Sequence, residues 1–133
     1  MFAGFAAALI SATKGSGPFK PTYIELPIPK GWPNPPTNIY ANNRPTEEGF
    51  QLGKKLFYDG RLSKDGHFPC ASCHQQFAAF ANYEHDLSHG FNNTFTQRNA
   101  PSLINLAWMR SYQWDGGANH IEVQPLVPLT APN

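Results

Sequence analysis

One stretch of the chain carries apolar positions at helical spacing on a single face: Phe50, Gly53, Leu56 and Phe57. Thr46 precedes this stretch as an N-cap, and two acidic residues follow it in the first turn, where the helix dipole favours negative charge. Asp59-Gly60 is a typical end signal. The pattern predicts a helix that begins after Thr46 and runs to about Tyr58, in which Gly53 lets a second helix backbone approach closely.

The rest of the domain predicts short helices joined by long connections. Residues 61–69 have the composition of a loop, and a short helix should begin near Cys70. Residues 100–109 carry apolar side chains on one side and predict another helix, and residues 119–124 predict a short helix that ends before Pro125. The expected fold class is mainly α.

Residues 15–45 hold too many prolines for a helix to persist, because each proline removes a backbone donor and fixes φ. They predict an extended, Pro-rich N-terminal arm. A free linker would be polar, so the apolar members of the arm indicate that it lies against the domain surface: Phe19, Tyr23, Ile24, Leu26, Ile28 and Trp32. The predicted domain then covers residues 46–133.

The first 14 residues form a separate segment. Its apolar run from Phe2 to Ile10, followed by Ser11-Ala12-Thr13, resembles the core and cleavage region of a secretory signal, although no Lys or Arg precedes it. An ordinary apolar strand or helix is the alternative. No apolar run approaches the roughly 20 residues of a membrane-spanning helix.

Composition narrows the class of protein further. The 133 residues include 13 Pro and 11 Gly, only 14% are charged and 14% are aromatic, which excludes collagen, a coiled coil and a long disordered tail. A formal net charge of +1 gives no field that gathers phosphates, so we expect no nucleic-acid partner. These values predict at most one loop-rich domain, wrapped around something flat and apolar.

The chain's two cysteines lie in one pentapeptide, Cys70-Ala71-Ser72-Cys73-His74. This is the attachment pattern of a c-type haem. Residues three apart share a face of a helical turn, so both thiols can add to the vinyl groups of one haem, and His74 can bind the iron as the proximal ligand. The pattern predicts one covalently bound haem c, whose porphyrin supplies apolar surface that so short a chain lacks.

The two cysteines also allow three other interpretations. Structural zinc needs four ligands, usually with a second Cys or His pair at short spacing, which the sequence lacks. A redox dithiol needs a preceding strand, whereas residues 63–69 form a polar loop that ends in proline. A plain disulfide leaves His74 unexplained. Because bacteria attach this haem outside the cytoplasm, the haem interpretation also favours a cleaved signal in residues 1–14.

Several separate motifs occur in a defined order between residues 33 and 133: Asn34 to Thr37, Leu52 to Ser63, Cys70 to His74, Arg98 to Asn105, Trp114 to Gly116, and Gln124 with Pro128. Together they resemble the N-terminal half of the bacterial di-haem cytochrome c peroxidase family, which includes MauG-like enzymes. The resemblance implies a cytochrome c-like haem domain of a periplasmic enzyme. It would reduce hydrogen peroxide to water with electrons from a small cytochrome or cupredoxin, which a second haem in a C-terminal domain receives.

The resemblance also assigns roles to single residues. His74 would be the proximal ligand of the peroxidatic haem, and His89 the distal histidine that some family members release on activation. Trp114 would stand between the two haems and Asn99 would bind the inter-haem calcium. The distal-side residues would be Gln124 and Pro128.

The chain also departs from the family pattern. The stretch between His89 and Arg98 is about two residues longer, and His85 is close enough to compete as the ligand. Gly117 stands where an arginine is common, and the family's catalytic glutamate would fall just after Asn133. With one Cys-x-x-Cys-His pattern, the chain is expected to be the N-terminal part of a longer enzyme, truncated at the C-terminus.

Alternatives remain open at this point. Asn99 could cap a helix at Ala100, and Trp114 could be an aromatic anchor at a domain face. His67, His85 and His120 default to surface roles. The rival function is a mono-haem electron carrier, for which Met109, expected inside a helix, is no obvious ligand, and a third is a docking haem domain. The electron donor, a peroxide or protein side-chain substrate, and the oligomeric state, including a homodimer, stay undetermined.

Overall fold

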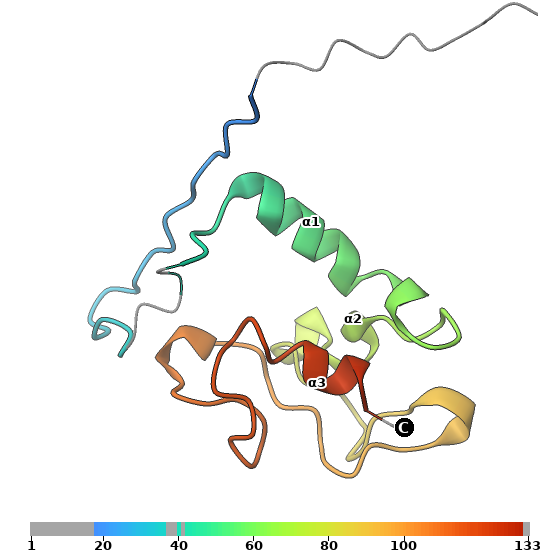
Figure 1. Ribbon diagram of the computed structural model, residues 1–133. Coiled ribbons are helices and arrows are strands. Elements are labelled where there is room, and N and C mark those ends of the chain that lie inside the picture. The colour runs from blue at the N-terminus through green and yellow to red at the C-terminus, as the bar shows by residue number, and fades with distance from the viewer. Residues whose placement is uncertain (1–17, 37–39, 41, 132–133) are drawn as a thin grey trace, which may run out of the picture.

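The computed structural model describes residues 18–36, 40 and 42–131, and the predicted signal segment lies outside them (Figure 1). Three α-helices occur in this part of the chain: α1 (Glu47–Phe57), α2 (Cys70–Cys73) and α3 (Leu126–Leu129). Single 3-10 turns separate them: η1 (Gly60–Leu62), η2 (Gln76–Ala78), η3 (Phe91–Asn93) and η4 (Leu106–Trp108). The described residues form isolated antiparallel bridges and no strand, so helices are their main regular element.

Helix α1 confirms the strongest prediction from the sequence. Thr46 is its N-cap, and the side-chain oxygen of Thr46 accepts a hydrogen bond from the Gly49 backbone N–H at 3.0 Å. The helix ends at Phe57, and Asp59 then caps η1. The close approach expected at Gly53 is wrong, because a Cβ built there meets nothing within 4 Å.

Two predicted helices are wrong. Residues 100–109 contain only the three-residue turn η4. Pro101 favours an extended residue before it, and Asn105 adopts a left-handed conformation (φ 58°), which interrupts a helix. Residues 119–124 form turns, and the helix α3 begins after Pro125 instead of ending before it. Pro125 has helical dihedrals (φ −63°, ψ −21°). The fixed φ of proline suits the start of a helix, so α3 follows Pro125 directly instead of a helix ending before it.

The arm begins against the start of α1. The backbone N–H of Glu47 donates to the Thr22 carbonyl at 2.8 Å, and that of Ile24 donates to the Pro45 carbonyl at 3.1 Å. Arg44 forms an ion pair with Glu25, and its guanidinium lies 4.7 Å from the centroid of the Tyr23 ring.

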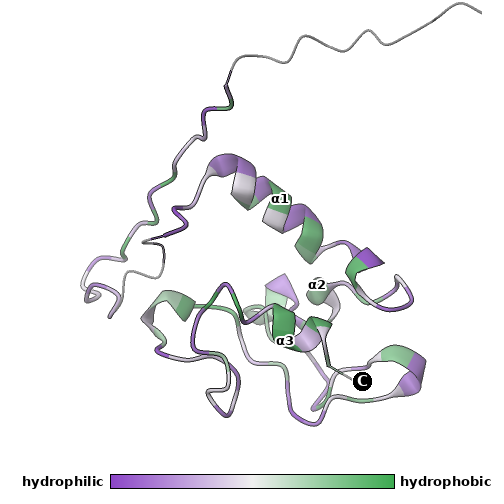
Figure 2. Ribbon diagram, viewed as in Figure 1, coloured by the Kyte–Doolittle hydropathy of each residue, from purple (hydrophilic) through white to green (hydrophobic). Residues whose placement is uncertain are grey.

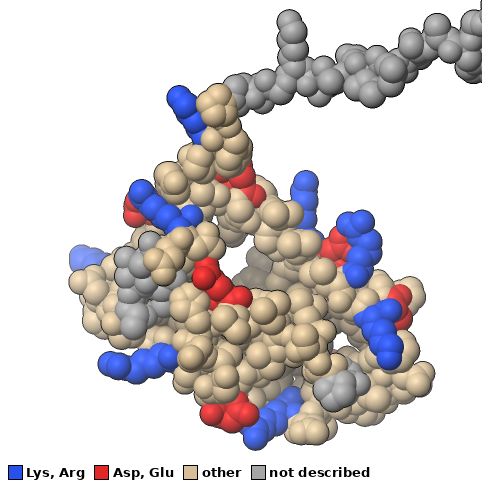
Figure 3. All heavy atoms as spheres, viewed as in Figure 1, with Lys and Arg blue, Asp and Glu red and all other residues tan. Residues whose placement is uncertain are grey.

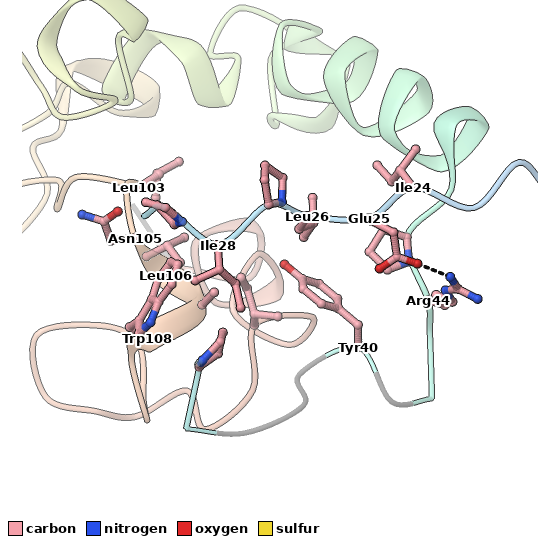
Figure 4. Close-up of a pocket in the computed structure, with 16 residues that line it drawn as sticks. Ile24, Glu25, Leu26, Ile28, Tyr40, Arg44, Leu103, Asn105, Leu106 and Trp108 are labelled. Atoms are coloured by element: carbon pink, nitrogen blue, oxygen red, sulfur yellow. Dashed lines mark hydrogen bonds and ion pairs between the residues drawn. The ribbon is translucent and has the colours of Figure 1, made fainter. Parts of the chain in front are cut away.

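The arm then reaches η4 at its other end. The Trp32 and Trp108 rings pack edge to face with centroids 4.8 Å apart, and the Trp108 indole N–H donates to the Pro33 carbonyl at 2.8 Å. Between these two attachments lies a groove of about 940 Å³, with Ile24 to Pro29 on one wall and Leu103, Leu106 and Trp108 on the other (Figure 4). The described part of the arm therefore lies beside the domain.

Few apolar side chains are enclosed. Tyr112 and Ala118, each 3% exposed, are the buried apolar residues of the described chain, and Ser88 is buried at 1%. Apolar segments are spread over loops as well as helices (Figure 2), and uncharged residues make up most of the face in Figure 3. No described helix is long and apolar enough to cross a membrane. The described residues thus leave much apolar surface uncovered.

Gly60 and Gly53 provide a matched pair of substitutions. A Cβ at Gly60 would lie 2.2 Å from the Gly66 carbonyl oxygen, whereas a Cβ at Gly53 meets open space. We expect Gly60→Ala to lower the free energy of unfolding by about 1–3 kcal/mol and Gly53→Ala to raise it by up to about 1 kcal/mol. Urea unfolding of both variants measures these changes, and equal stability of the two would contradict the described loop.

Candidate haem site

The loop before α2 is tied down by its own side chains. The Asp59 carboxylate accepts hydrogen bonds from the backbone N–H of Arg61 at 3.0 Å and from its guanidinium, and these bonds lower the pKa of Asp59 to about 2. The Ser63 hydroxyl donates to the Gly60 carbonyl at 2.7 Å and accepts from the Phe68 N–H at 3.0 Å. These hydrogen bonds therefore fix the direction in which the chain enters α2.

Helix α2 is a single turn that begins and ends with a cysteine. Both thiols are free, with Cys70 exposed and Cys73 partly exposed, and their spacing of three residues puts them on one face. Partial desolvation, with a smaller contribution from Cys73, raises the pKa of the Cys70 thiol. The turn leads directly to His74, whose backbone N–H donates to the Cys70 carbonyl at 3.0 Å.

The His74 imidazole has a defined hydrogen-bond partner. Its Nδ1 lies 2.9 Å from the carbonyl oxygen of Phe80. A carbonyl oxygen only accepts hydrogen bonds, so Nδ1 carries the proton, and in the neutral ring Nε2 keeps its lone pair. This is the form of histidine that binds a metal through Nε2.

The Phe80 carbonyl belongs to a tight turn that closes on Gln75. The Gln75 N–H donates to the Ala81 carbonyl at 3.0 Å, and the Phe80 N–H donates to the Gln75 carbonyl at 2.9 Å. Two consecutive residues of the turn, Ala79 (φ 55°) and Phe80 (φ 58°), are left-handed although neither is glycine. The chain thus holds an unfavourable backbone conformation beside His74.

These residues fit a covalently attached haem. Two free thiols on one turn match the two thioether bonds, and an imidazole held through Nδ1 matches a proximal iron ligand. Among the described residues, no group of three or more His, Cys, Asp or Glu lies together in a way that could hold a metal ion. Both thiols are free, so the structure gives no disulfide between them.

The two histidines that sequence analysis treated as competitors lie together. The rings of His85 and His89 are edge to face with centroids 5.1 Å apart, and the His89 ring also lies 4.7 Å from that of Phe95. Both histidines are exposed, and Ser88 between them is buried. The Ser88 hydroxyl accepts from Asn82 at 3.0 Å, and its N–H donates to the Thr96 hydroxyl at 2.9 Å. The loop that carries His85 and His89, here called the histidine loop, is therefore anchored by the hydrogen bonds of the buried Ser88.

Asn99 and Trp114 also meet. The Trp114 indole N–H donates to the Asn99 carbonyl at 2.7 Å, while the Trp114 side chain is 62% exposed. The Asn99 side-chain amide donates to the carbonyls of His85 and Asp86 at 3.3 and 3.0 Å. Asn99 caps no helix at Ala100, so that alternative is wrong. Its side chain closes the loop that carries the two histidines.

The remaining predicted site residues lie near the C-terminal end of the described chain. Gln124 is partly exposed in the turn before α3, and Pro128 is an exposed residue of α3 itself. Met109 is extended and 43% exposed, so its expected place inside a helix is wrong. The distal roles of Gln124 and Pro128, and calcium binding by Asn99, stay predictions.

The structure adds residues that sequence analysis missed. The Phe80 carbonyl is the partner of His74, and the Ser102 hydroxyl donates to the Ala79 carbonyl at 2.5 Å across 23 residues of sequence. Buried Ser88 supports the histidine loop. The sequence could not reveal the contacts of the Phe80 carbonyl and of Ser102, because both depend on a left-handed turn that forms without glycine.

The turn, its two thiols and the oriented imidazole fit the attachment pattern of a c-type haem. A family model described as di-haem cytochrome c peroxidase matches residues 47–133. The chain belongs to this family, as its sequence motifs predicted.

Individual relatives agree with the family assignment. The chain is 37% identical over 107 residues to the methylamine utilization protein MauG of Methylorubrum extorquens. The aligned segment covers 79% of this chain and 28% of MauG. It is 36% identical over 92 residues to the cytochrome-c peroxidase IdrP1 of a Pseudomonas species, covering 69% and 24%. A crystal structure of a MauG-like protein associated with microbial copper homeostasis superposes with a TM-score of 0.71 and 37% identity, covering 82% of this chain and 31% of that one. The chain thus spans less than a third of these relatives.

Proposed function

We propose that this chain is the N-terminal, peroxidatic haem half of a periplasmic enzyme that reduces hydrogen peroxide. The observation that carries the proposal is the His74 imidazole, fixed through Nδ1 beside the two thiols of α2 in a chain of this family. The relatives named cytochrome-c peroxidase support the reaction class. Reduction of one hydrogen peroxide takes two electrons and two protons and gives two water molecules.

The chain's own residues would hold and orient the cofactor. Cys70 and Cys73 would form its two thioether bonds, and His74 would present Nε2 to its iron. When bound, the haem supplies the one-electron redox chemistry that amino-acid side chains lack. The phenylalanine rings of residues 57 and 80, whose centroids are 6.0 Å apart, supply apolar surface next to this turn.

The other predicted site residues keep the roles that the family resemblance implies. His89 is proposed as a distal ligand, with His85 as its competitor because their rings touch. Gln124 and Pro128 are proposed to line the distal side. Asn99 is proposed to offer its side-chain oxygen to calcium, since its amide nitrogen already serves the His85 and Asp86 carbonyls.

The proposed partners follow from the electron path. A C-terminal domain with a second haem would deliver electrons from a small cytochrome or cupredoxin, and Trp114, exposed and anchored to Asn99, would lie at that interface. The length of the relatives supports a further domain, because this chain covers 28% of MauG. No nucleic-acid partner is proposed, and a homodimer is compatible with the site.

Covalent haem is the first test. We expect the chain, matured in a host that makes c-type cytochromes, to keep one haem after denaturation and acid-acetone extraction. Cys73→Ser should retain at most one thioether and be less stable, whereas Ser72→Ala, in the same turn, should keep both.

The chain alone should reduce peroxide about 10²- to 10⁴-fold more slowly than a longer protein with a second Cys-x-x-Cys-His, because proton transfer and electron delivery are incomplete.

Two results would contradict these expectations. Loss of all haem on extraction would overturn the haem site. Equal peroxide turnover by the chain alone would replace the two-haem proposal with a self-sufficient mono-haem enzyme. A weak far-red band typical of methionine ligation would instead favour the electron carrier, with Met109 as its ligand.

The distal ligand is tested separately by optical spectroscopy. If His89 binds the iron, the resting protein should be low-spin, and His89→Ala should make it high-spin, because the variant lacks the sixth iron ligand. His85→Ala is the matched control, since its ring lies in the same pair. A high-spin form in His85→Ala alone would reassign the ligand.

A further inference from the structure

The turn that faces His74 is held in a conformation that its residues do not favour. Ala79 and Phe80 are consecutive left-handed residues with side chains, and L-residues other than glycine avoid this region because Cβ crowds the backbone. Such a pair persists only when surrounding contacts over-determine it.

Three contacts hold the turn. Paired backbone hydrogen bonds join Gln75 to Phe80 and Ala81 at 2.9 and 3.0 Å. The Phe80 ring packs on the Phe57 ring at the end of α1, with an interplanar angle of 70°. The third contact comes from far along the chain, where the Ser102 hydroxyl donates to the Ala79 carbonyl at 2.5 Å.

The held conformation aims one atom at His74. The Ala79 carbonyl accepts the hydrogen bond from Ser102. The carbonyl of the next residue, Phe80, accepts from the His74 Nδ1–H at 2.9 Å. Fixing the first carbonyl limits rotation of the turn and therefore the direction of the second. Ser102 and His74 are thereby connected without touching.

We propose that Ser102 is a positioning residue for the proximal histidine, acting through the left-handed turn Ala79–Phe80 to keep the imidazole a Nδ1–H donor with Nε2 directed to the haem iron. This inference rests on the proposed function, in which His74 binds that iron. A hydrogen bond from Nδ1–H makes the imidazole a stronger donor to the metal. Stronger donation stabilises ferric over ferrous haem, so the bond lowers the reduction potential.

The test measures the haem reduction potential of the haem-loaded protein. It also measures the iron–histidine stretching frequency of the ferrous form in a His89→Ala background, where the proposed distal ligand is absent. In Ser102→Ala the turn relaxes and the bond to Nδ1 weakens. We expect the ferrous-to-ferric ratio at a fixed potential to rise by about two- to tenfold, where tenfold corresponds to about 59 mV for one electron. The iron–histidine stretch should shift to lower frequency.

Companion variants separate positioning from general damage. Ser102→Thr keeps the hydroxyl and should retain the wild-type potential, and Ser102→Cys, a weaker donor of similar size, should give an intermediate shift. Tyr112→Phe is the matched control, because the Tyr112 hydroxyl also donates to a backbone carbonyl, that of Leu106 at 3.1 Å, and Tyr112 has no proposed role at the haem. Its potential should not change.

The outcomes distinguish this inference from the proposed function. An unchanged potential and stretching frequency in both Ser102→Ala and Ser102→Cys, with haem still attached, would overturn the role of Ser102 alone. A shift of equal size in Tyr112→Phe would overturn it as well, by attributing the effect to general loosening. Failure of the wild-type protein to bind haem would instead overturn the proposed function.

Discussion

The structure depends on one constraint: the chain carries more apolar surface than its described residues can enclose. Tyr112 and Ala118 are the buried apolar residues there, while Phe77 is 76% exposed and Phe50 56%. A packed core of side chains is therefore not what holds these loops. The proposed haem at Cys70 and Cys73, together with the proposed second domain, would cover part of this surface.

Polar side chains take over much of the local organisation that a core would provide. Short side chains bond to backbone groups in other parts of several loops: Ser63, Thr96, Asn99 and Ser102. Each such bond fixes a loop that has no regular hydrogen-bond ladder. The same device orients the imidazole at the centre of the site, where the Phe80 carbonyl holds His74.

Sequence analysis succeeded where the signal is local. The Thr46 cap predicted α1, and the spacing of Cys70, Cys73 and His74 predicted a turn with both thiols on one face. It failed where backbone conformation overrides pattern, because apolar spacing in residues 100–109 gives no sign that Asn105 is left-handed. The hydrogen bond from Ser102 to the Ala79 carbonyl joins residues that are far apart in the sequence, so no local sequence pattern predicts it.

Amide hydrogen exchange of the haem-free and haem-loaded chains tests most directly whether the cofactor completes the fold. The Tyr112 and Ala118 amides, which bond to each other's carbonyls at 2.7 and 3.2 Å, report on the buried residues, and the His74 amide reports on α2. If the haem organises the apolar surface, these amides should exchange at least about 10²-fold more slowly in the haem-loaded chain. Equal protection in the haem-free chain would show that the side chains form a stable core by themselves and would contradict this account.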